Sequence, residues 1–125
     1  MSNPSVLNVV ALYSSLKLFS TTSIAELTEK AQKLTGYLES LLDALIQGAD
    51  TPAFQIITPR DPKQRGCQLS LLLNRNVGPI FDALTKAGIV VDKREPNCIR
   101  VAPVPLYNSF ADVHRFVSVL RKVLQ

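Results

Sequence analysis

The feature that most constrains the fold is one long apolar stripe in the first half of the chain. Apolar residues recur there at intervals of three and four, namely Ile24, Leu27, Ala31, Leu34, Leu38, Leu41, Leu42 and Leu45. This spacing aligns them along one side of an α-helix, and that side has to be covered by other elements. Ser23 and Glu26 form a Ser-x-x-Glu capping box, because each side chain can bond the other's unpaired backbone amide. We predict a helix that begins after Ser23 and ends near Gly48, a suitable left-handed C-terminal cap.

The remaining periodicity predicts three more helices and four short strands. At the N-terminus, Asn3 suits the N-cap and Pro4 the first helical position, and apolar residues at helical spacing continue to about Phe19. Ser109 is the expected N-cap of the last helix, with Asp112 three residues later. Strands are predicted over 54–58, 67–73, 89–91 and 99–102, and a third helix over 77–88.

These elements follow the order α-α-β-β-α-β-β-α. Because the strands are few, short and separated by hairpins and one helix, we expect a small, largely antiparallel sheet of three to four strands. Helices would cover one face of this sheet, which is an α+β fold. The 125 residues are long enough for one domain with its own core, so residues 1–125 are treated as a single domain.

The composition excludes several functional classes. The net charge is +4, but the basic residues are scattered and are not interleaved with aromatic residues, which argues against a nucleic-acid surface. No apolar run approaches the roughly 20 residues of a membrane helix. Cys67 and Cys98 lie far apart and lack metal-ligand spacing, so neither a metal site nor a disulfide framework is expected. A reducing, cytoplasmic location fits these observations best.

No self-contained active site can be recognised, and we predict no catalytic residue. His114 lies beside Asp112 and Arg115 on the last predicted helix and is expected to face solvent. Arg100 is of more interest, because strand alternation turns it away from Ile99 and Val101 and hence away from the core. Taken without further information, Arg100 is an ordinary exposed strand arginine or a member of a salt bridge.

Two segments nevertheless resemble the kynureninase family closely. The first is ITPRDPKQRGCQLS over residues 57–70, and the second is DKREPNCIRVAPVPLYNSF over residues 92–110. The family pattern has an Arg-Gly-Cys/Ala-Gln-Leu strand, then Asp-x-Arg-x-Pro before Ile-Arg-Val-Ala-Pro-Val-Pro-Leu-Tyr-Asn. The Ser-Asn-Pro start at residues 2–4 is also similar, so the resemblance extends over essentially the whole chain.

The resemblance implies the C-terminal small domain of an enzyme of the aspartate-aminotransferase-like fold type I, which uses pyridoxal phosphate. Kynureninases hydrolyse kynurenine or 3-hydroxykynurenine to anthranilate or 3-hydroxyanthranilate plus alanine, in tryptophan catabolism and NAD biosynthesis. They act as homodimers with active sites between subunits. Residues 1–22 would then be a helix that leads from the large cofactor domain, which holds most of the pyridoxal phosphate contacts.

The family pattern also assigns roles to particular residues. Arg100 matches the arginine that binds the substrate carboxylate, and Asn3 matches an asparagine at the cofactor and substrate pocket, although it can equally be a plain N-cap. Arg65, Gly66 and Arg94 are interpreted as turn and sheet-edge residues, with Arg94 paired to Glu95 or Asp92. We expect the Tyr107 and Asn108 side chains to fix the proline-rich loop.

The chain does not contain the segment with the lysine that forms the Schiff base in this family. The chain on its own is therefore expected to be inactive, either as a fragment or as one product of a split gene that needs a partner. The alternative is a noncatalytic interaction module that docks on a full kynureninase subunit. An exposed apolar face on the first helix would be the signature of that module.

Overall fold

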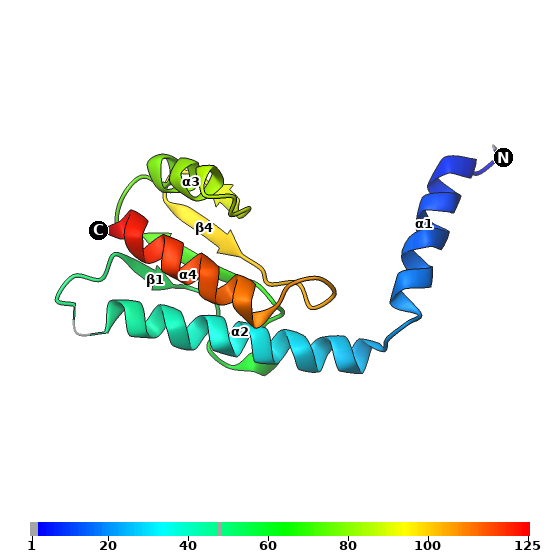
Figure 1. Cartoon of the computed structure of the whole chain (residues 1–125), viewed down its shortest axis with the longest axis horizontal. Coiled ribbons are helices and arrows are strands. Elements are labelled where there is room, and N and C mark those ends of the chain that lie inside the picture. The colour runs from blue at the N-terminus through cyan, green and yellow to red at the C-terminus, as the bar shows by residue number, and fades with distance from the viewer. Residues whose placement is uncertain (1–2, 48) are drawn as a thin grey trace.

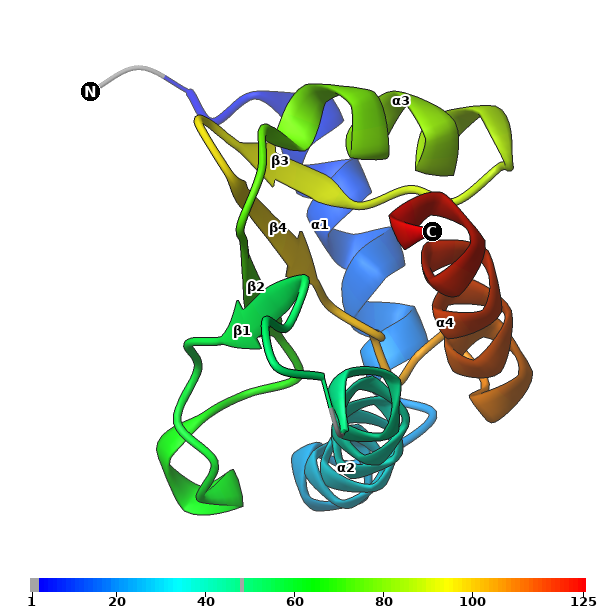
Figure 2. The ribbon, with the colours of Figure 1, turned by 90° about the vertical axis from the view of Figure 1, so that its left-hand side faces the viewer.

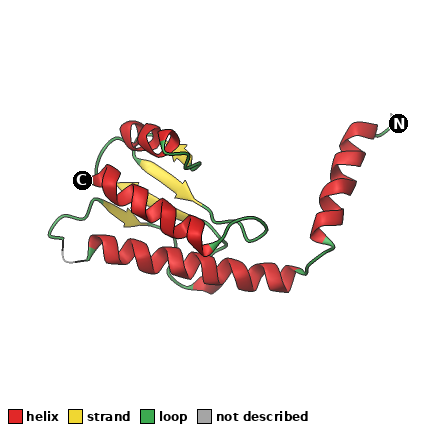
Figure 3. Ribbon diagram, in the orientation of Figure 1, coloured by secondary structure: helices red, strands yellow, loops and turns green. Residues whose placement is uncertain are grey.

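The computed structural model describes residues 3–47 and 49–125. Within them the element order is the predicted α-α-β-β-α-β-β-α, with one short 3₁₀-helix in addition. The elements are α1 (Val6–Phe19), α2 (Ile24–Ile46), β1 (Phe54–Ile56), the 3₁₀-helix η1 (Pro62–Gln64), β2 (Leu69–Leu73), α3 (Val77–Lys86), β3 (Asp92–Arg94), β4 (Cys98–Val101) and α4 (Phe110–Leu124). Figure 3 shows these helices and strands along the chain.

The four strands form one antiparallel sheet in the order β1-β2-β4-β3. Helices α2, α3 and α4 lie on one side of it (Figures 1 and 2). Alternate strand residues such as Leu71 and Ile99 face these helices and are fully buried with Leu38 and Leu120. None of the α-helices of the described residues lies on the opposite face in Figure 2, so the α+β prediction with one covered face is confirmed.

The capping signals place two of the helices correctly. Ser23 and Glu26 form the complete capping box of α2, and Ser109 and Asp112 form that of α4. The predicted Gly48 cap lies outside the described residues, and α2 itself ends at Ile46. Where both halves of a capping box are present, the helix start can thus be located to the residue.

The predicted start of α1 is wrong by two residues. The N-cap is Ser5 rather than Asn3, and the helix begins at Val6. Ser5 has the extended backbone that an N-cap requires, and serine is as favourable a residue type there as asparagine. Pro4 therefore lies outside the helix, and Asn3 is an exposed residue two positions before the N-cap.

The strand predicted at 89–91 is also wrong, because the third strand is β3 at Asp92–Arg94. Gly88 has a φ of 75°, and the amide of Ile89 still bonds the Leu84 carbonyl at the end of α3. The chain is thus still leaving the helix where the apolar run suggests a strand. Ile89 packs against the core as a loop residue, and the polar residues that follow form the edge strand.

A buried arginine connects α2 to the loop between β1 and β2. The Arg65 side chain is only 4% exposed and forms an ion pair with Glu39 of α2, whose side chain is 16% exposed. Arg65 also donates to the Pro59 carbonyl, and Arg60 bridges Glu39 and Asp43 at the surface. Arg65 therefore fixes the loop to the helix, in addition to shaping the turn.

We expect part of the stability of the chain to be lost in acid because of Glu39. The hydrogen bond from Arg65 holds the pKa of Glu39 below its usual value of 4.5, although burial opposes this shift. A carboxyl whose pKa is lower in the folded state stabilises the fold fully above its unfolded pKa, and this contribution disappears as the pH falls through the folded pKa. Urea unfolding at a series of acidic pH values should show that the free energy of unfolding falls more steeply with pH in the wild type than in Glu39→Gln. Parallel curves would contradict the prediction.

Helix α1 stands apart from the rest of the described chain (Figure 1). None of its residues is buried, and its large apolar side chains are all exposed, namely Val6, Leu7, Val9, Val10, Leu12, Tyr13, Leu16, Leu18 and Phe19. These side chains are spread around the helix instead of forming one stripe, a pattern typical of helices that are buried on all sides. None of the helices in the described ranges meets the length and hydropathy that crossing a membrane requires.

Candidate functional site

Arg100 lies on the face of the sheet that no helix covers. Its neighbours Ile99 and Val101 on β4 are buried, whereas the Arg100 side chain is 34% exposed. The alternation of β4 thus turns Arg100 away from the core, as predicted. Directly opposite it are Ser70 on β2 and Asp92 on β3. The residues of this face on the four strands are Gln55, Ser70, Leu72, Asp92, Arg94, Cys98 and Arg100.

Asp92 holds two arginines at this face. Nε and Nη2 of Arg100 both donate to Oδ2 of Asp92. Nε of Arg94 donates to the same oxygen at 3.1 Å, and its Nη2 lies 3.1 Å away. Asp92, Arg94 and Arg100 are called the sheet-face cluster below. With two guanidinium groups and one carboxylate, this cluster has a net positive charge.

The terminal nitrogen Nη1 of Arg100 donates to no residue in the described ranges 3–47 and 49–125. Arginine has five N–H donors, and Asp92 uses only the edge formed by Nε and Nη2. The other edge, formed by Nη1 and Nη2, retains the parallel donors that a carboxylate can accept in a bidentate manner. The sheet-face cluster is therefore suited to bind a carboxylate group.

The loop after β4 is fixed from two sides. Oδ1 of Asn108 accepts a hydrogen bond from the Val104 amide at 2.8 Å, and Nζ of Lys30 donates to the Pro105 carbonyl at 2.6 Å. The prediction that Asn108 fixes the proline-rich loop is confirmed. Tyr107 does not share this role, since its side chain is 75% exposed and forms no hydrogen bond with the described residues.

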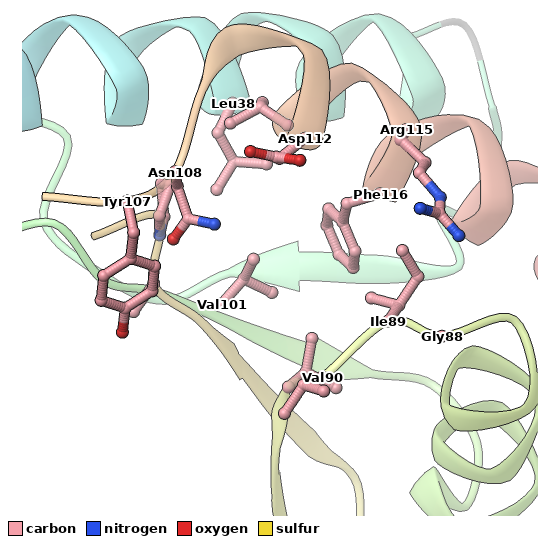
Figure 4. A pocket seen from close by; sticks show the side chains of 14 residues that line it. Leu38, Gly88, Ile89, Val90, Val101, Tyr107, Asn108, Asp112, Arg115 and Phe116 are labelled. Atoms are coloured by element: carbon pink, nitrogen blue, oxygen red, sulfur yellow. The ribbon is translucent and has the colours of Figure 1, made fainter. Parts of the chain in front are cut away.

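A cavity of about 370 Å³ lies between this loop, α4 and residues 88–91. Figure 4 shows Val90, Val101 and Phe116 around it, with Tyr107 and Arg115 among the polar lining residues. Arg100 is not among the lining residues, because the cavity includes the core residues Leu38 and Val113 of the helical side. The cavity and the sheet-face cluster are thus separate features.

The structure does not bring Asn3 and Arg100 together. Asn3 precedes α1, whose N-terminal end lies far from the sheet in Figure 1. The first turn of α1 contains no acidic residue, and Ser5 makes no side-chain capping bond, so its free amides remain open to an anion. Any site that uses both Asn3 and Arg100 would need further protein between them.

The lysines of the chain do not provide an enclosed site for pyridoxal phosphate. Six of them are exposed, and the half-buried Lys93 pairs with Glu95 at 3.0 Å. His114 is exposed, as predicted. No cluster of three or more potential metal ligands occurs in the part of the chain that the structure describes. The residues present are therefore suited to bind a carboxylate, but the lysines of this chain do not by themselves form a site for the cofactor.

The sequence reasoning missed the pairing of Asp92 with Arg100. It considered Asp92 only as a partner of Arg94, a pair that the structure contains as well. The missing information is the register of the β3–β4 hairpin, which places Asp92 opposite Arg100 and Arg94 opposite Cys98. Opposite charges at equal distances from the Glu95-Pro96-Asn97 turn were the available signal.

Solved structures of similar fold support the architecture. A NifS-like protein superposes with a TM-score of 0.65 at 23% identity, covering 80% of this chain and 28% of that protein. Acetylornithine aminotransferase from Elizabethkingia anophelis superposes with a TM-score of 0.61 at 22% identity. The match covers 80% of this chain and 24% of that protein. At this level of identity the similarity concerns the fold alone, which is that of the predicted C-terminal domain of fold type I enzymes.

Sequence comparison is more specific. The chain is 51% identical to the kynureninase of Monosiga brevicollis over 125 residues, covering 99% of this chain and 27% of that protein. The kynureninase of Rattus norvegicus is 47% identical to this chain over 128 residues, a match that covers 99% of this chain and 28% of that protein. The chain thus spans about a quarter of the length of these relatives. The family profile described as "Kynureninase C-terminal domain" matches residues 27–120. From this profile and these identities we conclude that the chain belongs to the kynureninase family and corresponds to its C-terminal domain.

Proposed function

We propose that this chain binds the substrate carboxylate in a kynureninase, through Arg100. The complete enzyme would hydrolyse kynurenine or 3-hydroxykynurenine to anthranilate or 3-hydroxyanthranilate and alanine. Following the family, we place this reaction in the cytoplasm, in tryptophan catabolism and NAD biosynthesis. The observation that carries the proposal is that Nη1 of Arg100, on the open face of the sheet, has no hydrogen-bond partner among the described residues, so the Nη1–Nη2 edge can still donate to a carboxylate.

The chemistry of the guanidinium group supports this role. It is planar, remains charged at physiological pH and donates two parallel hydrogen bonds to a carboxylate. The Arg100 side chain is about two-thirds shielded from solvent, which strengthens its interaction with an anion compared with that of a fully exposed arginine. Arg100 would therefore bind and orient the amino-acid end of the substrate.

Pyridoxal phosphate would supply the electron-withdrawing ring for bond cleavage, and residues outside this chain would hold most of it. Asn3 is our candidate for the contribution of this chain to the cofactor pocket. Its exposed position before the free amides of α1 supports this assignment, because those amides favour an anionic group. The family's active sites lie between subunits, so we propose that Asn3 and Arg100 meet in a homodimer that includes the large domain.

The surface of α1 supports the need for such a partner. Nine large apolar side chains are exposed on this one helix, including Leu7 at 81% and Val6 at 74%. We propose that residues 1–22 connect to the large cofactor domain and that this domain or the second subunit covers α1.

The test is to restore activity from two parts. The chain would be mixed with the part of the Monosiga brevicollis kynureninase that lies outside the match, called the large segment below, together with pyridoxal phosphate and kynurenine. We expect the two parts to co-elute in gel filtration and to release anthranilate, while the chain alone neither turns over nor forms a saturable lysine adduct. Turnover by the chain alone would overturn the proposal.

The alternative is a noncatalytic module that docks on a kynureninase subunit, and the exposed apolar surface of α1 is the observation that favours it. The same experiment separates the two functions. Co-elution with the large segment that restores no turnover would support the docking module and contradict the enzyme part.

A further inference from the structure

We propose that Asp92 is a positioning residue that orients the guanidinium group of Arg100 for carboxylate binding. The proposal rests on the proposed function of Arg100 and adds a second residue to it. Asp92 and Arg100 are directly opposite each other on the antiparallel strands β3 and β4. The backbone pairing of the sheet therefore fixes the distance between them, independently of any flexible loop.

The guanidinium group of Arg100 uses one edge for Asp92 and leaves a second edge available. Asp92 accepts from Nε and Nη2 through one oxygen, Oδ2, and leaves Nη1 free of partners within the described residues. A carboxylate that accepts from Nη1 and the second Nη2 hydrogen would approach a different edge of the same plane. Asp92 and the substrate can thus be bound simultaneously, and Asp92 sets the direction in which the free edge points.

Arg94 places a second positive charge beside Arg100 and so increases the need for the Asp92 carboxylate. Its Nε donates to the same Oδ2 of Asp92, which therefore separates two guanidinium groups on one face of the hairpin. Without Asp92 the two cations would repel each other, and the Arg100 side chain would regain the rotamers that Asp92 removes. The carboxylate of Asp92 is therefore required to hold Arg100 in one direction.

Positioning and simple electrostatics predict opposite results when Asp92 is neutralised. Removing a negative charge beside a carboxylate site should strengthen the binding of an anion if charge alone mattered. If Asp92 positions Arg100, the same change weakens binding because the free edge is no longer directed at the substrate. The direction of the change in KM thus decides between the two.

The experiment uses a chimeric kynureninase in which this chain follows the large segment. We expect Asp92→Asn to raise KM for kynurenine by about tenfold with a smaller effect on kcat, since an oriented charge-assisted contact is lost. Asp92→Glu should restore part of the affinity, because it keeps the carboxylate. Glu95→Gln is the matched control, because it removes the same charge from the same hairpin. Among the described residues Glu95 forms an ion pair only with Lys93, so the KM of this variant should be unchanged.

A double-variant cycle separates this inference from the proposed function. In an Arg100→Ala background, Asp92→Asn should have no further effect on KM. If Arg100→Ala alone left KM unchanged, the proposed function would fail. If Arg100→Ala raised KM while Asp92→Asn left it unchanged or lowered it, only the role of Asp92 would be overturned. Asp92→Glu also provides a readout should Asp92→Asn fail to fold.

Discussion

Replacing Arg100 by alanine is expected to lower kcat/KM of the chimeric kynureninase by about a hundredfold to a thousandfold. Truncating one partner of a shielded, hydrogen-bonded charge pair removes about 3–4 kcal/mol of interaction, and each 1.4 kcal/mol corresponds to a factor of ten. Arg100→Lys should lie between the alanine variant and the wild type, because it retains the charge but not the bidentate fork. The effect is expected to be large because the substrate carboxylate would be left without its partner.

Steady-state kinetics with kynurenine measures this effect. Arg121→Ala is the control, because Arg121 is an exposed arginine near the end of α4 and takes no part in the proposed site. Its kinetics should match those of the wild type. Wild-type kinetics for Arg100→Ala would remove the assignment of Arg100 as the carboxylate-binding residue.

Replacing Glu39 by glutamine is expected to destabilise the fold by about 2–3 kcal/mol, since removing one partner of a buried ion pair leaves the other charge uncompensated. The charge left without its partner is that of Arg65, whose side chain is almost completely buried and whose other contact is the Pro59 carbonyl. Arg60 retains Asp43 as a partner, so the loss is confined to Arg65. The expected loss in the free energy of unfolding is smaller than for a fully buried pair, because the Glu39 side chain keeps some contact with solvent.

Urea unfolding of the chain followed by circular dichroism measures this loss. The control is Glu29→Gln, which breaks the pair with Lys33 in which both side chains are mostly exposed, and it should cause no measurable change. Equal midpoints for Glu39→Gln and Glu29→Gln would show that the buried pair does not stabilise the fold.

Much of the fold could be predicted because its signals are local. The stripe that contains Leu34 and Leu38, and the capping boxes at Ser23 and Ser109, depend on residues within a few positions of one another. The two errors arose where neighbouring positions compete. Ser5 competes with Asn3 as N-cap, and residues 89–91 are still part of the exit from α3.

The candidate site was only half predictable. Strand alternation gives the outward direction of Arg100, but from the sequence its role could be predicted only through the family resemblance. The contact with Asp92 requires the hairpin register, and the contact of Arg65 with Glu39 joins residues 26 positions apart. Local periodicity carries no information about such pairings, because they depend on how the elements come together.

Because α1 stands apart from the other described elements, the chain has two regions whose stability depends on different contacts. The elements from α2 to α4 surround one hydrophobic core, so the stability of this region comes from contacts within the chain. Within the described residues α1 has no buried side chain, and a 14-residue helix without packed neighbours is only marginally stable in water. In the proposed assembly, the affinity of this protein for its partner would therefore include the free energy of forming α1, and the apolar residues on that helix would contribute to quaternary rather than tertiary stability.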